Sequence, residues 1–421
     1  MFQWNEVYPY NAVHVVRIPK PLEVNRVSQV VNSLLETCGL THLGIDRSKG
    51  TFHYHGGPVA HPIKVIEGKG DLGLALSSEI EGQLNAPFAD AVTINPFRFF
   101  ALPEKNCFYL GLVYLHPISG AESIVFLLKS IVNIYMGKAD VNDHLCPNLY
   151  PGGYLGLFKI TLKSLLGWLC TLPSLISDLR SSFRVSYKDA GDHTIGFSLF
   201  SVDQDQFLAL ARVAKLWGVT LNDIFLALLL KSLSPFAMDR MSSPRRRRIS
   251  IASIVNIRRD LSLDIRDPFG LFLGSFIVSH AVPGGINLET LARDIRRQTV
   301  RIKQYQLSIR TALALALARH LIPLLSPPRR GKFYIKYYPL WGGISNVNLN
   351  PLWKDGDEES APDYIRAVST GPVSPLVLSI TTVNDLLNIG VSYKTTVFAR
   401  EDVQKIITTF SDSLNTLGAT V

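Results

Sequence analysis

Cysteine is scarce in this sequence of 421 residues, and the few thiols are scattered. No CxxC spacing occurs, which argues against a zinc site and against a disulfide framework, and which fits a reducing compartment. The opening residues, MFQWNEVYPYN, lack a basic segment and an apolar segment. We therefore expect no signal peptide and a cytoplasmic protein. The four cysteines are Cys38, Cys107, Cys146 and Cys170.

Long apolar runs are also missing. No run reaches the roughly 18 uninterrupted apolar residues that a membrane-spanning helix needs. Two stretches come near, 154–176 and 311–325, but charged residues and prolines interrupt both. Each can lie on the inner face of a membrane as a peripheral contact or line an acyl-binding groove. An ordinary core helix is the alternative for both.

Motifs for phosphates, nucleotides and metals are absent. The glycines of 68–75 match neither a P-loop nor a dinucleotide pattern, so we expect no redox cofactor. His53 and His55 share one face of a predicted strand, which pairs with 41–46 as a hairpin. No further ligands stand at suitable spacing, so we expect no metal site.

What the chain does have is an apolar, basic composition. Hydrophobic residues make up 47% and charged residues 18%, which is typical of a globular protein. The net charge of +9 favours an acidic partner, such as a carrier protein, coenzyme A or anionic lipid. Basic clusters at 243–248 and 327–332 can dock such a partner, and solvated loops are the alternative. No nucleic-acid motif accompanies them, so we expect no nucleic-acid partner.

The order of predicted elements indicates a mixed α/β fold in two similar halves. A Pro/Gly-rich stretch, CPNLYPGGY at 146–154, marks a boundary between them. The sequence therefore predicts an N-terminal lobe over 1–150, an apolar linker over 151–190 and a C-terminal lobe over 191–421.

The stretch YLHPISGAES, residues 114–123, places a lone histidine at the end of an apolar strand. Small residues follow His116, and an apolar run at 121–136 then predicts a helix. An isolated histidine in such a place is commonly a buried group satisfied by backbone. The neighbouring pattern favours another interpretation.

Several segments resemble the condensation-domain superfamily, which includes the chloramphenicol-acetyltransferase-like fold. Its motif HHxxxDG joins a central strand to a helix, and His116 occupies the position of the second, catalytic histidine. Leu115, Gly120 and Ala121 replace the first His, the Asp and the Gly. Further segments match in the same order, so the resemblance covers nearly the whole chain: 218–229, 255–261 and 342–349.

The resemblance implies two chloramphenicol-acetyltransferase-like lobes, each a mixed sheet flanked by helices, with a tunnel between them. It also implies an acyltransferase that moves an acyl group from a coenzyme A or carrier-protein thioester to a hydroxyl or amine. The wax-ester synthase and alcohol acyltransferase branch fits better than a modular peptide synthetase, and the apolar composition suggests lipid or secondary-metabolite biosynthesis. His116 would be the general base, as a neutral imidazole suits that task.

Other residues receive roles from the same resemblance. Backbone amides near Ser119 and Gly120 would steady the developing oxyanion. Ser345 and Asn346 would contact substrate in the channel, with an ordinary turn as the alternative. The pair Asn222 and Asp223 would be structural, with helix capping as the alternative, and Thr220 or Asn222 is a candidate cap. Arg258 would brace the two lobes.

The missing motif Asp leaves a second interpretation open. In relatives that Asp pairs with the arginine that corresponds to Arg258, which here would lack its partner. Glu122 lies two positions later and is a candidate substitute for the Asp, although its register is wrong for a direct replacement. The chain is therefore either an active enzyme with altered scaffolding or a catalytically lapsed protein that binds a partner as a scaffold, at a membrane surface or elsewhere.

Overall fold

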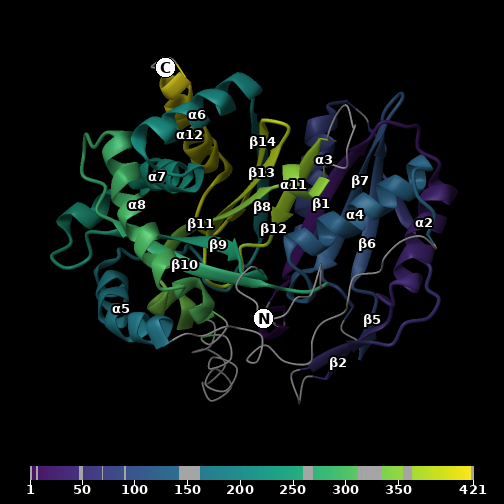
Figure 1. Cartoon of the computed structure of the whole chain (residues 1–421), viewed down its shortest axis with the longest axis horizontal. Helices are drawn as coiled ribbons and strands as arrows, with labels where there is room; N and C mark the ends of the chain where they lie inside the picture. Colours follow the sequence, from purple (N-terminus) through teal and green to yellow (C-terminus); the bar gives the residue numbers. More distant parts are fainter. Residues whose placement is uncertain are drawn as a thin grey trace.

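The computed structural model of the chain has two lobes side by side (Figure 1), each with a β-sheet and helices packed against it. It describes all residues except 1, 6–7, 47–50, 69, 90–91, 142–161, 259–268, 312–313, 315–332, 354–362 and 419–421. The predicted boundary stretch, the second basic cluster and most of the apolar run at 311–325 lie outside the described residues.

The first lobe contains β1 (Asn11–Ile18), α2 (Val24–Thr37), β4 (Ile63–Val65), α3 (Leu72–Asn85), β6 (Phe97–Pro103), β7 (Phe108–Leu115), α4 (Ala121–Met136) and β12 (Tyr364–Val368). Its sheet has the strand order β12-β1-β7-β6-β4. Central β1 and β7 are buried almost throughout, as expected for strands covered on both faces. Helices α2 and α4 pack on one face and α3 on the other. The predicted helix 121–136 is confirmed.

Strand β12 comes from the second half of the chain but belongs to the first sheet. It pairs antiparallel with β1, and the short helix α11 (Asn350–Trp353) before it packs beside α4. The buried side chains of Trp353 and Tyr364 belong to the first lobe's core. The range 191–421 predicted for the C-terminal lobe therefore includes an excursion into the N-terminal lobe, which links the two.

The second lobe contains β8 (Ile195–Val202), α6 (Gln204–Trp217), α7 (Leu221–Leu233), η3 (Ser234–Ser242), β9 (Ile249–Asn256), β10 (Leu273–His280), α8 (Leu288–Gln304), η5 (Leu307–Ile309), β11 (Leu340–Asn348), β13 (Leu376–Val383), β14 (Leu386–Lys394) and α12 (Arg400–Gly418). Its sheet has the order β10-β9-β11-β13-β14-β8. Strand β11 is parallel to β9 and β13, and the other pairs are antiparallel.

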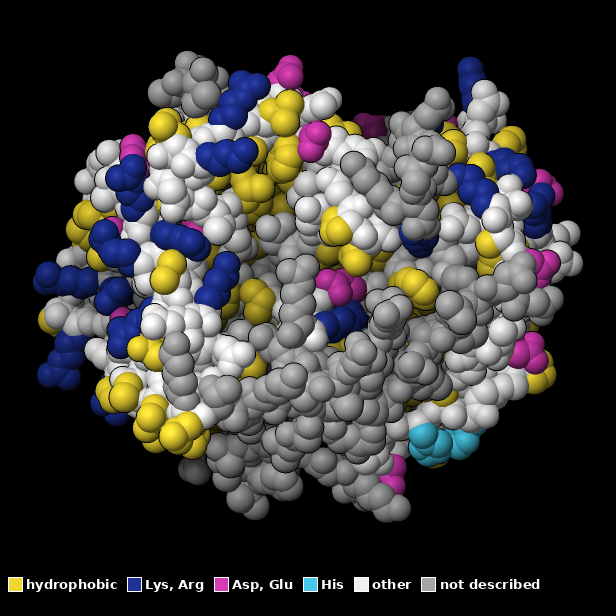
Figure 2. Space-filling model, viewed as in Figure 1, with side chains coloured by type: hydrophobic (Ala, Val, Ile, Leu, Met, Phe, Trp, Pro, Cys, Tyr) yellow, Lys and Arg dark blue, Asp and Glu magenta, His cyan; other side chains and the backbone are white. Residues whose placement is uncertain are grey.

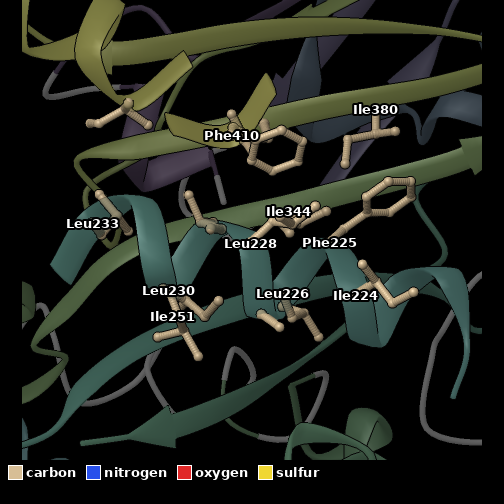
Figure 3. Packing of buried hydrophobic residues seen from close by; sticks show 14 of the residues in the cluster. Ile224, Phe225, Leu226, Leu228, Leu230, Leu233, Ile251, Ile344, Ile380 and Phe410 are labelled. Atoms are coloured by element: carbon tan, nitrogen blue, oxygen red, sulfur yellow. The ribbon is translucent and has the colours of Figure 1, made fainter. Parts of the chain in front are cut away.

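Helix α7 is the centre of the second lobe's core (Figure 3). Its leucines pack against Ile251, Ile344 and Ile380, which come from three adjacent strands, and against Phe410 of α12. The stretch Leu221–Ser242 is long and apolar enough to cross a membrane by length and composition, yet most of it is buried inside this lobe. That burial identifies it as a core helix.

The remaining elements are smaller or connect the lobes. They are α1 (Phe2–Asn5), β2 (Leu43–Asp46), β3 (Thr51–Tyr54), β5 (Thr93–Ile94), η1 (His116–Ile118) and α5 (Leu162–Ser181). The predicted hairpin is confirmed, because β2 pairs antiparallel with β3. Within the predicted linker, α5 docks on the second lobe, where the Trp168 Nε1–H donates to the Tyr305 carbonyl at 3.1 Å.

Candidate active site

A cavity of about 1030 Å³ is bounded by strands of both sheets. Its size is that of a large ligand pocket. The first sheet contributes His14 on β1, Tyr114 on β7 and Arg366 on β12, and His116 follows at the end of β7. The second sheet contributes Ala252 and Ile254, Gly343 and Ser345, and Val377 and Ser379.

Strand register explains why these side chains meet. Directly opposed residues of paired strands point to the same face, and alternate residues share that face. His14 is opposed to Arg366, and Ser345 is opposed to both Ile254 and Ser379. Each sheet therefore presents one coherent row of side chains to the cavity.

His116 borders this cavity at the point where β7 ends. Its backbone N–H donates to the Tyr10 carbonyl at 3.0 Å, which holds the end of β7 against β1. Its ring contacts Tyr10 and Tyr114, with ring centroids 5.0 and 5.9 Å away. Nδ1 lies 3.3 Å from the Ser119 carbonyl oxygen. Since a carbonyl only accepts, Nδ1 carries the proton in this contact, and Nε2 keeps its lone pair.

The electrostatics of the site keep the imidazole neutral. Burial lowers the pKa of His116 to about 4, and the charge of Arg366 acts in the same direction. Burial also lowers the pKa of His14 well below its usual value, with Arg366 and His116 as further causes. Both imidazoles are uncharged at neutral pH.

Arg258 has a carboxylate partner, and it is Glu122, the candidate substitute for the missing Asp. Its Nη1 lies 3.1 Å from Oε2 of Glu122, and its Nη2 donates to Ser123 Oγ at 2.6 Å. Glu122 and Ser123 lie in the first turn of α4, whose start turns both toward the second lobe. Glu122 therefore braces Arg258 although it lies two positions after the motif Asp. The first turn of α4 determines where this carboxylate lies, and the spacing of the motif does not.

Ser119 and Gly120, whose backbone amides are predicted to steady an oxyanion, lie in the loop between β7 and α4. Neither is among the described residues that border the cavity. The Ser119 N–H donates to the His116 carbonyl at 3.3 Å, and the Gly120 N–H donates to the Gly270 carbonyl at 3.0 Å. These amides already have acceptors, so they hold the loop after β7 instead of facing an oxyanion.

Of the predicted channel contacts, Ser345 borders the cavity and Asn346 does not. Both lie within β11, so the alternative of an ordinary turn is wrong. Successive side chains of a strand point to opposite faces, so Asn346 shares the face of Ile344, which packs against α7. Of the two residues only Ser345 is placed to meet a ligand in the cavity, and its contact with a substrate stays a prediction.

The pair Asn222 and Asp223 is structural. Thr220 caps α7, and its hydroxyl and the Asp223 carboxylate form a reciprocal capping box. Asp223 also accepts a hydrogen bond of 2.6 Å from Thr299 on α8. Asn222 contacts Ser253 at 3.4 Å. This pair therefore joins α7 to its neighbours and lies outside the cavity.

Sequence reasoning missed two residues of the site, His14 and Arg366. Each interrupts an apolar strand, in AVHVVRI and YIRAV, and each is at most 4% exposed. A charged or polar residue within an apolar strand is the signal that could have identified them. The Tyr364 hydroxyl meets Nδ1 of His14 at 2.8 Å and fixes that ring.

One rim of the cavity is basic. Arg248, from the predicted cluster 243–248, forms an ion pair of 3.0 Å with Asp178. Arg310 donates to the Trp168 carbonyl, and Arg301 on α8 is exposed. Lys and Arg side chains gather on the side of the molecule that carries α6 and α8 (Figure 2).

Aromatic side chains form another part of the cavity wall. The Trp4 Nε1–H donates to the Tyr334 hydroxyl at 3.0 Å, and Phe333 and Tyr338 lie next to them. All four border the cavity. Within the described part of the chain, no three His, Cys, Asp or Glu side chains come together as a metal site.

Comparison with known proteins finds matches to solved structures but none to sequence families. No family model and no curated protein matches the sequence. Solved condensation and cyclization domains do match in structure. The first condensation domain of the calcium-dependent antibiotic synthetase, bound to a substrate analogue, superposes with a TM-score of 0.66 at 13% identity, covering 99% of this chain and 94% of that chain.

Two further structures agree. The EpoB cyclization-docking bidomain from Sorangium cellulosum has a TM-score of 0.66 at 12% identity, over 98% of this chain and 80% of that chain. The condensation domain of the Monacolin K polyketide synthase MokA has a TM-score of 0.64 at 9% identity, over 99% and 95%. The chain therefore has the two-lobed condensation-domain fold, and the fold expected from the resemblance is confirmed.

Proposed function

We propose that this protein is an acyltransferase that moves an acyl group from a thioester to a hydroxyl or amine. The observation that carries the proposal is the position of His116, which borders a cavity that both lobes line. Its Nδ1 is committed to the Ser119 carbonyl, so Nε2 is the nitrogen available as a base. The condensation-domain fold supports the same reaction class.

The reaction would proceed through a tetrahedral adduct. Nε2 of His116 takes the proton of the acceptor hydroxyl or amine while the acceptor atom attacks the thioester carbonyl carbon. The adduct then collapses, the C–S bond breaks, and the thiolate receives the proton from the imidazolium. His116 returns to its neutral form, and every atom of the product comes from the two substrates.

The donor would be coenzyme A or a phosphopantetheinyl carrier protein. The basic rim with Arg301 and Arg310 suits the phosphate that either donor carries. The aromatic wall around Trp4 and Tyr334 suits an apolar acyl chain or acceptor. No cofactor beyond the donor is part of this proposal.

Product detection by mass spectrometry tests the proposed reaction. The full chain is incubated with acyl-coenzyme A or acyl-carrier thioesters of several chain lengths and with a panel of alcohols and amines. We expect an ester or amide product that is absent with the His116→Ala variant. Product formation at equal rates by both proteins would contradict the proposal.

A binding or scaffold role is the second candidate, and one observation favours it. An imidazole whose pKa is lowered to about 4 is a weak base. A protein of this kind would hold a ligand in the cavity without turning it over. Equal ligand affinity of the wild-type chain and the His116→Ala variant, without product from either, identifies this role.

We also propose that the protein lies in the cytoplasm and contacts the inner face of a membrane through α5. The helix exposes a row of apolar side chains at helical spacing, and their one-sided exposure suits a lipid surface. Flotation with vesicles that contain one-third phosphatidylserine should recover the wild-type chain and lose a Leu165→Ser, Leu169→Ser variant. Flotation of both to the same extent contradicts this contact. The exposed row is Leu162, Leu165, Leu166, Leu169, Leu172 and Ile176.

A further inference from the structure

Arg366 is a buried cation that has no carboxylate partner among the described residues. It lies on β12, is 4% exposed, and borders the cavity. Its Nε donates to Thr381 Oγ1 at 2.9 Å, and its Nη2 donates to the carbonyls of Ser345 at 2.8 Å and Ile380 at 2.7 Å. Its Nη1 has one long contact of 3.5 Å with Ser345 Oγ.

Comparison with Arg240 shows what a purely structural buried arginine looks like in this protein. The guanidinium of Arg240 donates to four backbone carbonyls and to Ser234 Oγ, and it does not border the cavity. In Arg366 the Nε and Nη2 edges are satisfied in a similar way, but Nη1 is not. A buried charge without a counter-ion is costly, so the incomplete edge at the cavity calls for an anionic group from a ligand.

The surroundings of Arg366 define the charge of that ligand. His14, its directly opposed neighbour on β1, and His116 are both neutral at pH 7, because burial lowers the pKa of each. The other cavity-lining arginines belong to the rim or have partners of their own. One uncompensated positive charge in a low-dielectric pocket is balanced by a ligand with a single negative charge. A dianion would bring one negative charge too many.

Hydroxyls and apolar groups define its shape. Ser345 and Ser379 are opposed on β11 and β13, and both border the cavity. Ile254, Val368 and Val377 add apolar surface around them. A guanidinium with neighbouring hydroxyl donors fits the two oxygens of a carboxylate, and the apolar surface fits a neutral body attached to it.

We propose that Arg366 binds the carboxylate of a small organic acid whose remaining body is neutral and largely apolar. We identify this acid as the acyl acceptor, with its hydroxyl or amine directed to His116, and this identification rests on the proposed function. The existence of the carboxylate-binding site does not depend on the proposed function. An acceptor of this class is an α-hydroxy or α-amino acid, in which a nucleophile and a carboxylate stand on adjacent atoms.

Binding of matched acids and amides to the full chain tests the site. The probes are hexanoate and 2-hydroxy-4-methylpentanoate, each compared with its neutral primary amide by isothermal titration calorimetry. A charge-assisted hydrogen bond predicts that the wild-type chain binds each acid at least about tenfold more tightly than its amide. The Arg366→Gln variant should lose this preference and retain the amide affinity, which shows that the cavity is intact. Arg366→Lys should keep part of it.

The matched control is Arg297→Gln, the same substitution at an exposed arginine of α8 that does not border the cavity. It should leave the preference unchanged. An equal affinity for acid and amide, an unchanged preference in Arg366→Gln, or binding of neither acid would each overturn the proposal. Because the assay needs no turnover, a His116→Ala variant that binds the acids normally but transfers no acyl group separates the two proposals.

Discussion

Glu122 on α4 and Arg258 beyond β9 form an ion pair between the lobes, with Oε2 and Nη1 3.1 Å apart. The guanidinium also donates to Ser123 Oγ and lies over the Phe272 ring, with its Cζ 4.8 Å from the ring centroid. The pair therefore locks the first turn of α4, which directly follows the loop after His116, to the opposite lobe.

Removal of Glu122 should weaken that lock. We expect Glu122→Ala to lower the free energy of unfolding by about 1–3 kcal/mol, because the ion pair between Glu122 and Arg258 is lost. Urea unfolding followed by tryptophan fluorescence measures the loss. The double variant Glu122→Ala, Arg258→Ala should lose less than the sum of the two single variants. Additive losses would show that the two side chains are not coupled.

The lowered pKa of His116 predicts a specific acid sensitivity. The unfolded chain takes up a proton near pH 6.5, whereas the folded chain does so only near pH 4. Stability is therefore lost as the pH falls from about 6.5 to 4. The His116→Gln variant should lose about 2 kcal/mol less than wild type between pH 7 and pH 5. Exposed His53→Gln is the control, and equal losses in both variants would contradict the burial of the His116 ring.

Arg240 should matter for stability and not for binding in the cavity. Arg240→Ala leaves several buried carbonyls without donors, and we expect a loss of about 3 kcal/mol in the free energy of unfolding. Arg297→Ala, at an exposed side chain of α8, should change it by less than about 0.5 kcal/mol. Denaturant midpoints at constant m-value measure both, and similar values for the two would refute the distinction.

Gly390 on β14 permits a close approach between the sheets. A Cβ at this position would lie 2.2 Å from the Arg366 carbonyl oxygen. Gly390→Ala should therefore cost about 1–3 kcal/mol and displace β12, with a reduced preference for acids over amides. Gly82→Ala on α3 is the control, because its Cβ would meet nothing within 4 Å. A neutral Gly390→Ala would argue against this packing.

The arrangement of elements was predictable because it depends on local patterns. The helix over 121–136, the hairpin at β2 and β3, and the Thr220 cap follow from apolar spacing, turn residues and capping chemistry. The two-lobed fold followed from motifs in a consistent order. These signals lie within short stretches of the chain, so no knowledge of long-range packing was needed.

The site was less predictable because it depends on contacts between distant segments. His14 and Arg366 are opposed only because β12 crosses into the first sheet, and no local pattern announces that crossover. The partner of Arg258 depended on the rotation of α4, which motif spacing does not specify. The sequence also does not show that the backbone N–H groups of Ser119 and Gly120 donate to carbonyls of the chain itself.

The most direct test of the account is the rate of acyl transfer by three proteins prepared in parallel: wild type, His116→Ala and His53→Ala. Single-turnover product formation is measured by mass spectrometry with the donor and acceptor found active for the wild type. General-base catalysis predicts a loss of about 10²–10⁴-fold for His116→Ala, with the variant still folded at the assay temperature, and wild-type rates for His53→Ala. Transfer by His116→Ala at the wild-type rate would contradict the assignment of His116 as the base.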